Sequence, residues 1–129
     1  MSTSNQTYVA IIDDESSLRT ALSRLLRIAG FQTIAYPSAE AFLADAKAPR
    51  FDCLLIDIRL GGMSGLDLLR QLAAHEAHAP VIVITAFDDP DMRSQAAALG
   101  CSGFFRKSDP GREVVDAIRR AMLPEGAKA

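Results

Sequence analysis

Three runs of apolar residues constrain the fold of this chain more than any other feature of its sequence. The runs read YVAIID from Tyr8, CLLIDI from Cys53 and VIVIT from Val81, and each is nearly continuous in apolar side chains. A half-exposed strand alternates apolar and polar residues, whereas a strand that is buried on both faces of a parallel sheet has no need to alternate. The runs therefore predict central strands of a sheet that is covered on both faces.

Helix-like spacing separates these runs and two further β-rich segments. The predicted strands are Tyr8–Asp13, Gln32–Tyr36, Cys53–Ile58, Val81–Thr85 and Gly103–Arg106. Apolar residues recur every three or four positions in Leu18–Ala29, Phe42–Ala46, Leu66–Ala73, Met92–Leu99 and Val114–Met122. Ser38, Asp89 and Asp109 are predicted helix caps, and Gly30 and Gly100 are predicted helix stops. Five strand–helix repeats predict an α/β fold, a (βα)5 doubly wound five-stranded parallel sheet with right-handed crossovers.

Length and charge favour one globular domain without an affinity for polyanions. The 129 residues suffice for one core, 49% of them are hydrophobic, and the net charge is -2. We expect a disordered segment at residues 1–7, the domain at 8–123 and a tail at 124–129, where Pro124 and Gly126 end the last helix. Because the chain has no basic stripe and no helix-turn-helix pattern, we expect no direct nucleic-acid contact from these residues.

The sequence also predicts a cytoplasmic location and no membrane partner. No apolar run approaches the ~18 residues of a transmembrane helix, and the start MSTSNQTYVA has no signal-peptide pattern. The two cysteines, Cys53 and Cys101, fit no disulfide or metal framework, so we expect reduced thiols. His75 and His78 are expected to be solvated.

Polar residues follow four of the five predicted strands. Their side chains could bind metal or phosphate, and they are Asp13 and Asp14 after the first strand, Asp57 at the end of the third, Thr85 at the end of the fourth and Lys107 past the fifth. Ligands of open α/β sheets bind outside the carboxyl ends of the strands, where the strand order reverses. The order 2-1-3-4-5 makes the second strand an edge and brings Asp13, Asp14 and Asp57 into one crevice.

Three carboxylates in one crevice need compensation. Two unit charges ~4 Å apart repel by about 4 kcal/mol at an effective dielectric near 20. Protonation of one carboxyl group is one remedy, and a hard divalent cation such as Mg²⁺ is the other. With Lys107 as a point charge and Thr85 as a hydroxyl donor, the crevice suits a phosphoryl group on Asp57.

These motifs resemble the receiver domains of response regulators in bacterial two-component signalling. The resemblance covers residues 7 to 123 and rests on IIDDE, LLIDIRLGGMSGLDLL, VIVITAF and GFFRKSDP. The segments DIRLGGMSGLDLL and RKSDP are most similar in sequence to receivers attached to helix-turn-helix transcription factors. The fold that this family implies is the flavodoxin-like receiver fold.

The resemblance implies a role for each matching residue. Asp57 is the phosphoacceptor, and Mg²⁺ is held by Asp13, Asp14, Asp57 and the backbone carbonyl of Arg59. Lys107 and Thr85 bind the phosphoryl group. Phe104 is an aromatic switch that moves with Thr85. The side chains of Arg59 and Phe87 flank the path of the hydrolytic water and tune the lifetime of the phosphoryl group.

The resemblance also implies partners. A sensor histidine kinase or a phosphotransfer protein donates the phosphoryl group, and the face made by the fourth helix, the fifth strand and the fifth helix relays the signal. That face would also carry a phosphorylation-dependent dimer. The sequence does not identify the output domain or downstream protein. In this family the only catalysis is of the domain's own phosphorylation and dephosphorylation.

Two positions depart from the family pattern. Gly61 and Ser108 stand where the family usually has proline, so the loop after Asp57 gains freedom and a cis bond after Lys107 becomes costly. Three alternatives stay open. They are an aspartyl phosphotransferase or phosphatase, a flavin- or nucleotide-binding domain of the same topology, and a receiver-like module that acts without phosphorylation. The first generally needs an acid where Arg59 stands, and the second needs a phosphate loop where the chain has DDESS.

Overall fold

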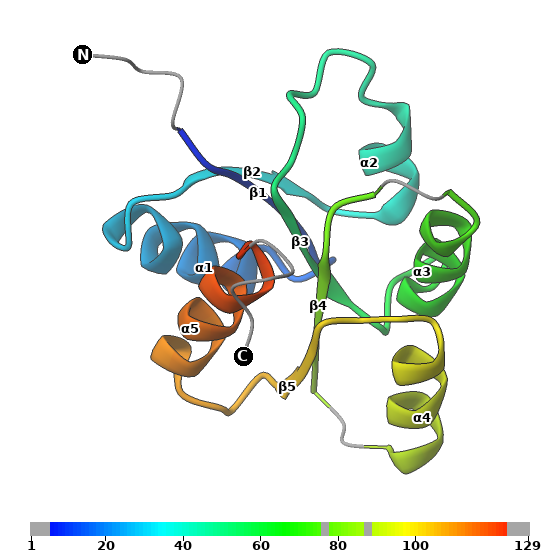
Figure 1. The fold of residues 1–129 in the computed structure, drawn as a ribbon. Coiled ribbons are helices and arrows are strands. Elements are labelled where there is room, and N and C mark those ends of the chain that lie inside the picture. Colours follow the sequence, from blue (N-terminus) through cyan, green and yellow to red (C-terminus); the bar gives the residue numbers. More distant parts are fainter. Residues whose placement is uncertain (1–5, 76–77, 87–88, 124–129) are drawn as a thin grey trace.

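Five parallel strands form the centre of the molecule in the computed structural model, which describes residues 6–75, 78–86 and 89–123 (Figure 1). The strands are β1 (Tyr8–Ile12), β2 (Gln32–Tyr36), β3 (Cys53–Asp57), β4 (Val81–Thr85) and β5 (Gly103–Arg106). The helices are α1 (Ser16–Ile28), α2 (Ala39–Ala44), α3 (Gly65–Ala73), α4 (Pro90–Ala98) and α5 (Gly111–Ala121). The sheet order is β2-β1-β3-β4-β5, which confirms the predicted topology.

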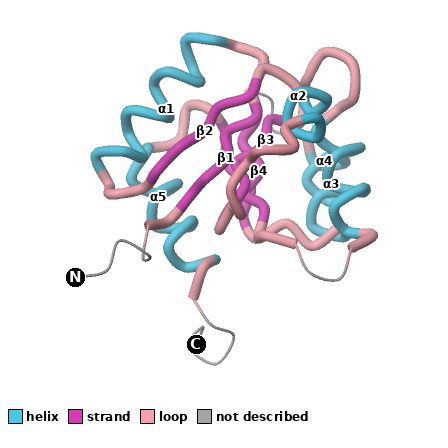
Figure 2. Tube along the Cα trace, turned by 90° about the horizontal axis from the view of Figure 1, so that it is seen from above, coloured by secondary structure: helices cyan, strands magenta, loops and turns pink. Residues whose placement is uncertain are grey.

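The helices cover both faces of the sheet. Seen from above, α1 and α5 lie on one side of the strands, and α2, α3 and α4 lie on the other (Figure 2). Neighbouring residues of a strand pack into opposite layers, so that Leu54 and Ile56 face α2, α3 and α4 while Cys53 and Leu55 face α1 and α5. This two-sided burial explains why β1, β3 and β4 are continuous in apolar residues.

Local sequence signals set several of the helix ends. The hydroxyl of Ser38 accepts the Ala41 N–H at the start of α2, and the Asp89 carboxylate accepts the Asp91 N–H at the start of α4, as predicted. Gly30 and Gly100 have φ values of 101° and 87°, which suits the residue after a helix. The expected tail, most of the expected disordered start and the position of Phe87 lie outside the described residues.

The predicted cap at Asp109 is wrong. Helix α5 is preceded by Pro110 as its N-cap residue, and no side chain caps it. The Asp109 carboxylate instead accepts the Arg106 backbone N–H at 2.8 Å and lies 3.5 Å from the Arg106 guanidinium. Asp109 therefore closes the turn between β5 and α5. Strands β1 and β3 also end one residue earlier than predicted, at Ile12 and Asp57.

The structure also shows where the cysteines and histidines lie. Cys53 is buried, Cys101 is half-buried, and both thiols are free. His75 and His78 are exposed. Within the described ranges, no helix combines the length and the apolar character needed to cross a bilayer.

Gly65 provides a sharp test of how strand β3 packs against the start of α3. A Cβ atom built on Gly65 would lie 2.1 Å from the backbone oxygen of Asp57, whereas a Cβ on Gly61 would meet no atom within 4 Å. We therefore expect Gly65→Ala to lower the free energy of unfolding by about 2–3 kcal/mol, because backbone atoms have no room to move aside. Gly61→Ala should change it by less than about 1 kcal/mol. Urea denaturation of both variants tests this, and equal stabilities would contradict the close packing.

Candidate functional site

Asp13 and Asp57 use the same local structure at the ends of two adjacent strands. Oδ1 of Asp13 accepts the N–H of Glu15 at 2.8 Å, and Oδ1 of Asp57 accepts the N–H of Arg59 at 3.1 Å. Each is a turn in which an aspartate bonds the backbone two residues ahead, which directs the chain away from the sheet. The Arg19 guanidinium adds a 2.7 Å hydrogen bond to the Asp13 carbonyl oxygen. One carboxylate oxygen of each aspartate therefore shapes the backbone, and the other remains for the crevice.

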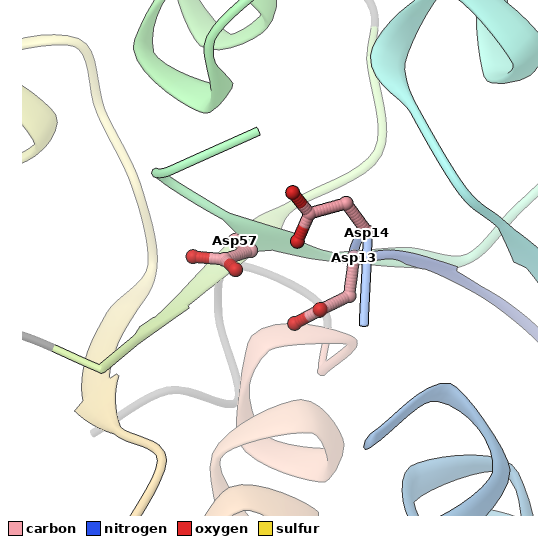
Figure 3. A group of neighbouring side chains, drawn as sticks. All are labelled: Asp13, Asp14 and Asp57. Carbon is pink, nitrogen blue, oxygen red and sulfur yellow. The ribbon is translucent and has the colours of Figure 1, made fainter. Parts of the chain in front are cut away.

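The remaining oxygens converge with Asp14. Oxygen atoms of Asp13, Asp14 and Asp57 lie within 4.8 Å of one another, and the side chains face a common space (Figure 3). Asp13 and Asp57 are buried, while Asp14 is exposed. Oδ2 of Asp13 is fully buried and makes an ion pair but no well-oriented hydrogen bond. The predicted cluster thus forms at the carboxyl ends of β1 and β3.

Lys107 brings a positive charge into contact with the carboxylates of this cluster. Its Nζ lies 3.0 Å from Oδ2 of Asp57, 3.3 Å from Oδ2 of Asp13 and 3.5 Å from Oε1 of Glu15. The Lys107 backbone N–H donates to the Thr85 carbonyl oxygen at 2.8 Å, which fixes where the side chain begins. The Lys107–Ser108 bond is trans, and Lys107 reaches the two buried carboxylates with it.

Burial and charge act in opposite directions on the pKa values of this pair. Burial is the largest effect on Asp57 and raises its pKa, although hydrogen bonds from Lys107 and the Arg59 N–H lower it. Burial lowers the pKa of Lys107, but its contacts with Asp57 and Asp13 outweigh that effect, so the net shift is upward. Lys107 therefore stays charged, and the ionised Asp57 is costly to keep in this crevice without further positive charge.

The cluster fits a hard divalent cation by several independent features. All its donors are carboxylate oxygens, the ligand type that Mg²⁺ prefers. The buried Oδ2 of Asp13 has an ion pair with Lys107 but no well-oriented hydrogen bond. The carboxylates outnumber the Lys107 ammonium that they share, and a divalent cation would offset this excess of negative charge. Asp13, Asp14 and Asp57 could therefore hold Mg²⁺. Arg59 lies two residues after Asp57, so its backbone carbonyl oxygen could serve as a further ligand.

Thr85 and Phe104 share the face of the sheet that packs against α3 and α4. Thr85 is fully buried and follows Val81 and Val83 in the alternation along β4, both of which face that layer. Phe104 pairs with Val83 and packs on the same layer. The Arg93 guanidinium of α4 lies 4.5 Å from the Phe104 ring centroid. The two predicted switch residues are therefore neighbours on adjacent strands.

The sequence reasoning missed two residues of this region. Glu15 contacts Lys107 and belongs to the motif IIDDE, so its position beside the aspartates was an available signal. Glu40 lies in α2, and its Oε2 accepts the N–H of Met63 in the loop after β3 at 2.8 Å. No local pattern indicates that second contact, because 23 residues separate its partners.

Comparison with known proteins identifies the family. Residues 9–119 match the family described as response regulator receiver domain. The transcriptional regulatory protein FixJ of Rhizobium meliloti is 39% identical over 113 residues, which cover 88% of this chain and 55% of that protein. The response regulator protein TodT of Pseudomonas putida is 36% identical over 114 residues, covering 88% and 50%. This chain thus spans about half the length of these curated relatives.

The solved structures agree with the sequence comparison. The crystal structure of FixJ-N is 37% identical with a TM-score of 0.82, and the match covers 92% of this chain and 94% of that one. The structure of the response regulator StyR is 34% identical with a TM-score of 0.82, covering 91% and 59%. Family match, sequence identity and fold together show that the chain belongs to the response regulator receiver domains, a family of bacterial two-component systems whose members are controlled by phosphorylation.

Proposed function

We propose that Asp57 is the phosphoacceptor of this receiver domain and that Mg²⁺ bound at Asp13, Asp14, Asp57 and the Arg59 carbonyl supports the transfer. The observation that carries this proposal is the meeting of Lys107 Nζ with Oδ2 of both Asp57 and Asp13, 3.0 and 3.3 Å away, at a cluster of three carboxylates. The donor is a sensor histidine kinase or a phosphotransfer protein. When bound, the cation supplies positive charge to the phosphoryl oxygens.

The residues of the chain divide the work of the transfer. A carboxylate oxygen of Asp57 forms a bond to phosphorus as the bond from phosphorus to the donor's nitrogen breaks, and that electron pair leaves with the donor imidazole. The Arg59 N–H holds the other carboxylate oxygen in place. The Lys107 ammonium pairs with the Asp57 carboxylate before the transfer and with the phosphoryl oxygens after it. The Thr85 hydroxyl donates a hydrogen bond to the phosphoryl group. Both residues bind rather than react.

We propose that the signal of phosphorylation is relayed through the face formed by α4, β5 and α5. Phosphorylation adds about -1.5 to -2 charges to the crevice, which suffices to bias a two-state element. Thr85 and Phe104 are the proposed element, since they lie on neighbouring strands of one sheet face. The same face is proposed for a phosphorylation-dependent dimer. Since relatives are named as transcriptional regulators, we propose that any contact with DNA lies outside these residues.

Two further parts of the proposal concern catalysis and location. The domain is proposed to catalyse its own phosphorylation and dephosphorylation and no other reaction. A separate phosphatase activity is disfavoured because Arg59, and not an acid, stands two residues after Asp57. The proposed location is the cytoplasm, where the free thiols of Cys53 and Cys101 stay reduced.

The phosphoacceptor assignment predicts a mass change that depends on one residue. After incubation with Mg²⁺ and acetyl phosphate, intact-mass spectrometry should show the gain of one phosphoryl group in the wild type and none in Asp57→Asn. The matched control is Asp67→Asn, an exposed aspartate of α3 paired with Arg70, which should be phosphorylated as the wild type is. Modification of Asp57→Asn would contradict the assignment. If acetyl phosphate modifies neither protein, beryllofluoride binding tests the same site without a donor.

The electrostatic cost of Asp57 predicts an unusual effect on stability. Because burial raises the pKa of Asp57, the folded state favours its neutral form, and Asp57→Asn should raise the free energy of unfolding by about 1 kcal/mol at pH 8 without divalent cations. The gain should shrink as pH falls and the wild-type carboxyl group becomes protonated. Saturating Mg²⁺ should stabilise only the wild type. Thermal unfolding with and without Mg²⁺ measures this, and a destabilised Asp57→Asn would refute the explanation.

The side chains of Arg59 and Phe87 are proposed to shield the phosphoryl group from water. We therefore expect Arg59→Ala and Phe87→Ala to shorten the half-life of the phosphorylated domain severalfold. The measurement is the decay of phosphoprotein after the donor has been removed, in Mg²⁺ buffer. Half-lives equal to that of the wild type would exclude this role for both side chains.

A further inference from the structure

The loop between Asp57 and α3 contains two adjacent glycines, Gly61 and Gly62. Gly62 has a φ of +74°, in the region that favours glycine, and a Cβ on Gly61 would meet no atom within 4 Å. Two glycines give the unrestrained backbone many conformations. This loop also carries Arg59, whose carbonyl oxygen is the proposed fourth protein ligand of the metal. A site with one ligand on such a loop needs a restraint from elsewhere.

The base of the loop is restrained by α3. The Gly65 N–H donates to the Ile58 carbonyl oxygen at 2.8 Å, and Gly65 packs against the Asp57 backbone. The hydroxyl of Ser64 accepts the Asp67 N–H at 3.0 Å, which starts the helix. These contacts bring the two ends of the loop together.

A carboxylate from a different part of the chain restrains the tip. Oε2 of Glu40 accepts the Met63 N–H at 2.8 Å. The same oxygen lies 2.6 Å from where a Cβ of Gly62 would be, so it occupies the space that the glycine leaves open. The hydrogen bond from Met63 is the largest cause of the lowered pKa of Glu40, which keeps the carboxylate ionised.

Glu40 is itself held by its helix. It is the second residue of α2, directly after Ala39, which is fully buried, and two residues after the Ser38 cap. The cap bonds the Ala41 N–H at 3.0 Å. Because the start of α2 is anchored, the Glu40 carboxylate is able to restrain the Gly61–Gly62 loop, whose glycines allow many backbone conformations.

We propose that Glu40 is a positioning residue for the metal site, which holds the Gly61–Gly62 loop so that the Arg59 carbonyl stays preorganised beside the carboxylate cluster. The inference rests on the proposed binding of Mg²⁺ by this domain. Glu40 does not touch the metal. Its hydrogen bond to Met63 restrains a loop whose glycines leave the backbone free. Outer-shell partners orient metal ligands in the same way.

The test is a calorimetric titration of Mg²⁺ into the wild type, Glu40→Ala and Glu40→Gln. We expect roughly tenfold weaker binding by Glu40→Ala, the lower end of the effect of outer-shell changes on metal affinity. Glu40→Gln keeps an acceptor oxygen and should lose less. The matched control is Glu113→Ala, which removes the same charge from the first turn of α5 and should bind as the wild type does.

Two further measurements separate positioning from general destabilisation. Hydrogen exchange of the Met63 amide without Mg²⁺ should accelerate in Glu40→Ala, while exchange in the core strands stays unchanged. Gly61→Ala added to Glu40→Ala should restore part of the affinity, because it narrows the conformations of the loop without a steric clash.

The outcomes distinguish this inference from the proposed function. Wild-type affinity in Glu40→Ala, with Mg²⁺ bound by both proteins, would overturn the positioning role and leave the metal site intact. A wild type that fails to bind Mg²⁺ would overturn the metal site and the positioning role together. An equal loss in Glu113→Ala would assign the effect to charge alone and would also overturn the inference.

Discussion

Repulsion among three carboxylates is the constraint around which this end of the molecule is organised. The parallel strands β1 and β3 place Asp13, Asp14 and Asp57 at one edge of the sheet. Nearby hydrogen bonds and ion pairs offset part of their repulsion. Each buried aspartate gives one oxygen to a backbone N–H and turns the other to Lys107. The compensation is incomplete, since several carboxylates share the Lys107 ammonium and the buried Oδ2 of Asp13 has an ion pair but no well-oriented hydrogen bond. A fold that only needed stability would not keep this arrangement, so the imbalance supports the proposed cation.

The sequence was most informative where one physical rule decided the outcome. An aspartate that ends a run such as CLLIDI is costly in a buried strand, and its place at the carboxyl end of β3 follows from that cost. The lack of a polar group after Gln32–Tyr36 correctly indicated an edge strand. Strand ends were off by one residue because side-chain hydrogen bonds of Asp13 and Asp57 start the turns earlier than the apolar pattern suggests.

Sequence reasoning failed where two local signals competed or where the contact was distant. Asp109 before Pro110 has the pattern of a helix cap, yet Arg106 lies three residues earlier and binds the same carboxylate, so the turn takes precedence over the cap. Glu40 has the pattern of an acidic residue in a first helical turn, where it interacts favourably with the helix dipole. Its contact with Met63 depends on how α2 lies against the loop after β3, which only the tertiary structure provides.

Thr85 connects the crevice to the rest of the fold in a way that favours switching. Its carbonyl oxygen receives the Lys107 N–H, while its side chain lies on the sheet face that Phe104 shares. The restraint on Phe104 from the α4 side includes the Arg93 guanidinium, and a cation–π contact at a partly exposed site contributes only about 0.5–1 kcal/mol. A charge change in the crevice acts on the Lys107 ammonium with an energy of a few kcal/mol. The stronger interaction lies at the crevice and the weaker one at the Phe104 ring, which is the order that the proposed switch requires.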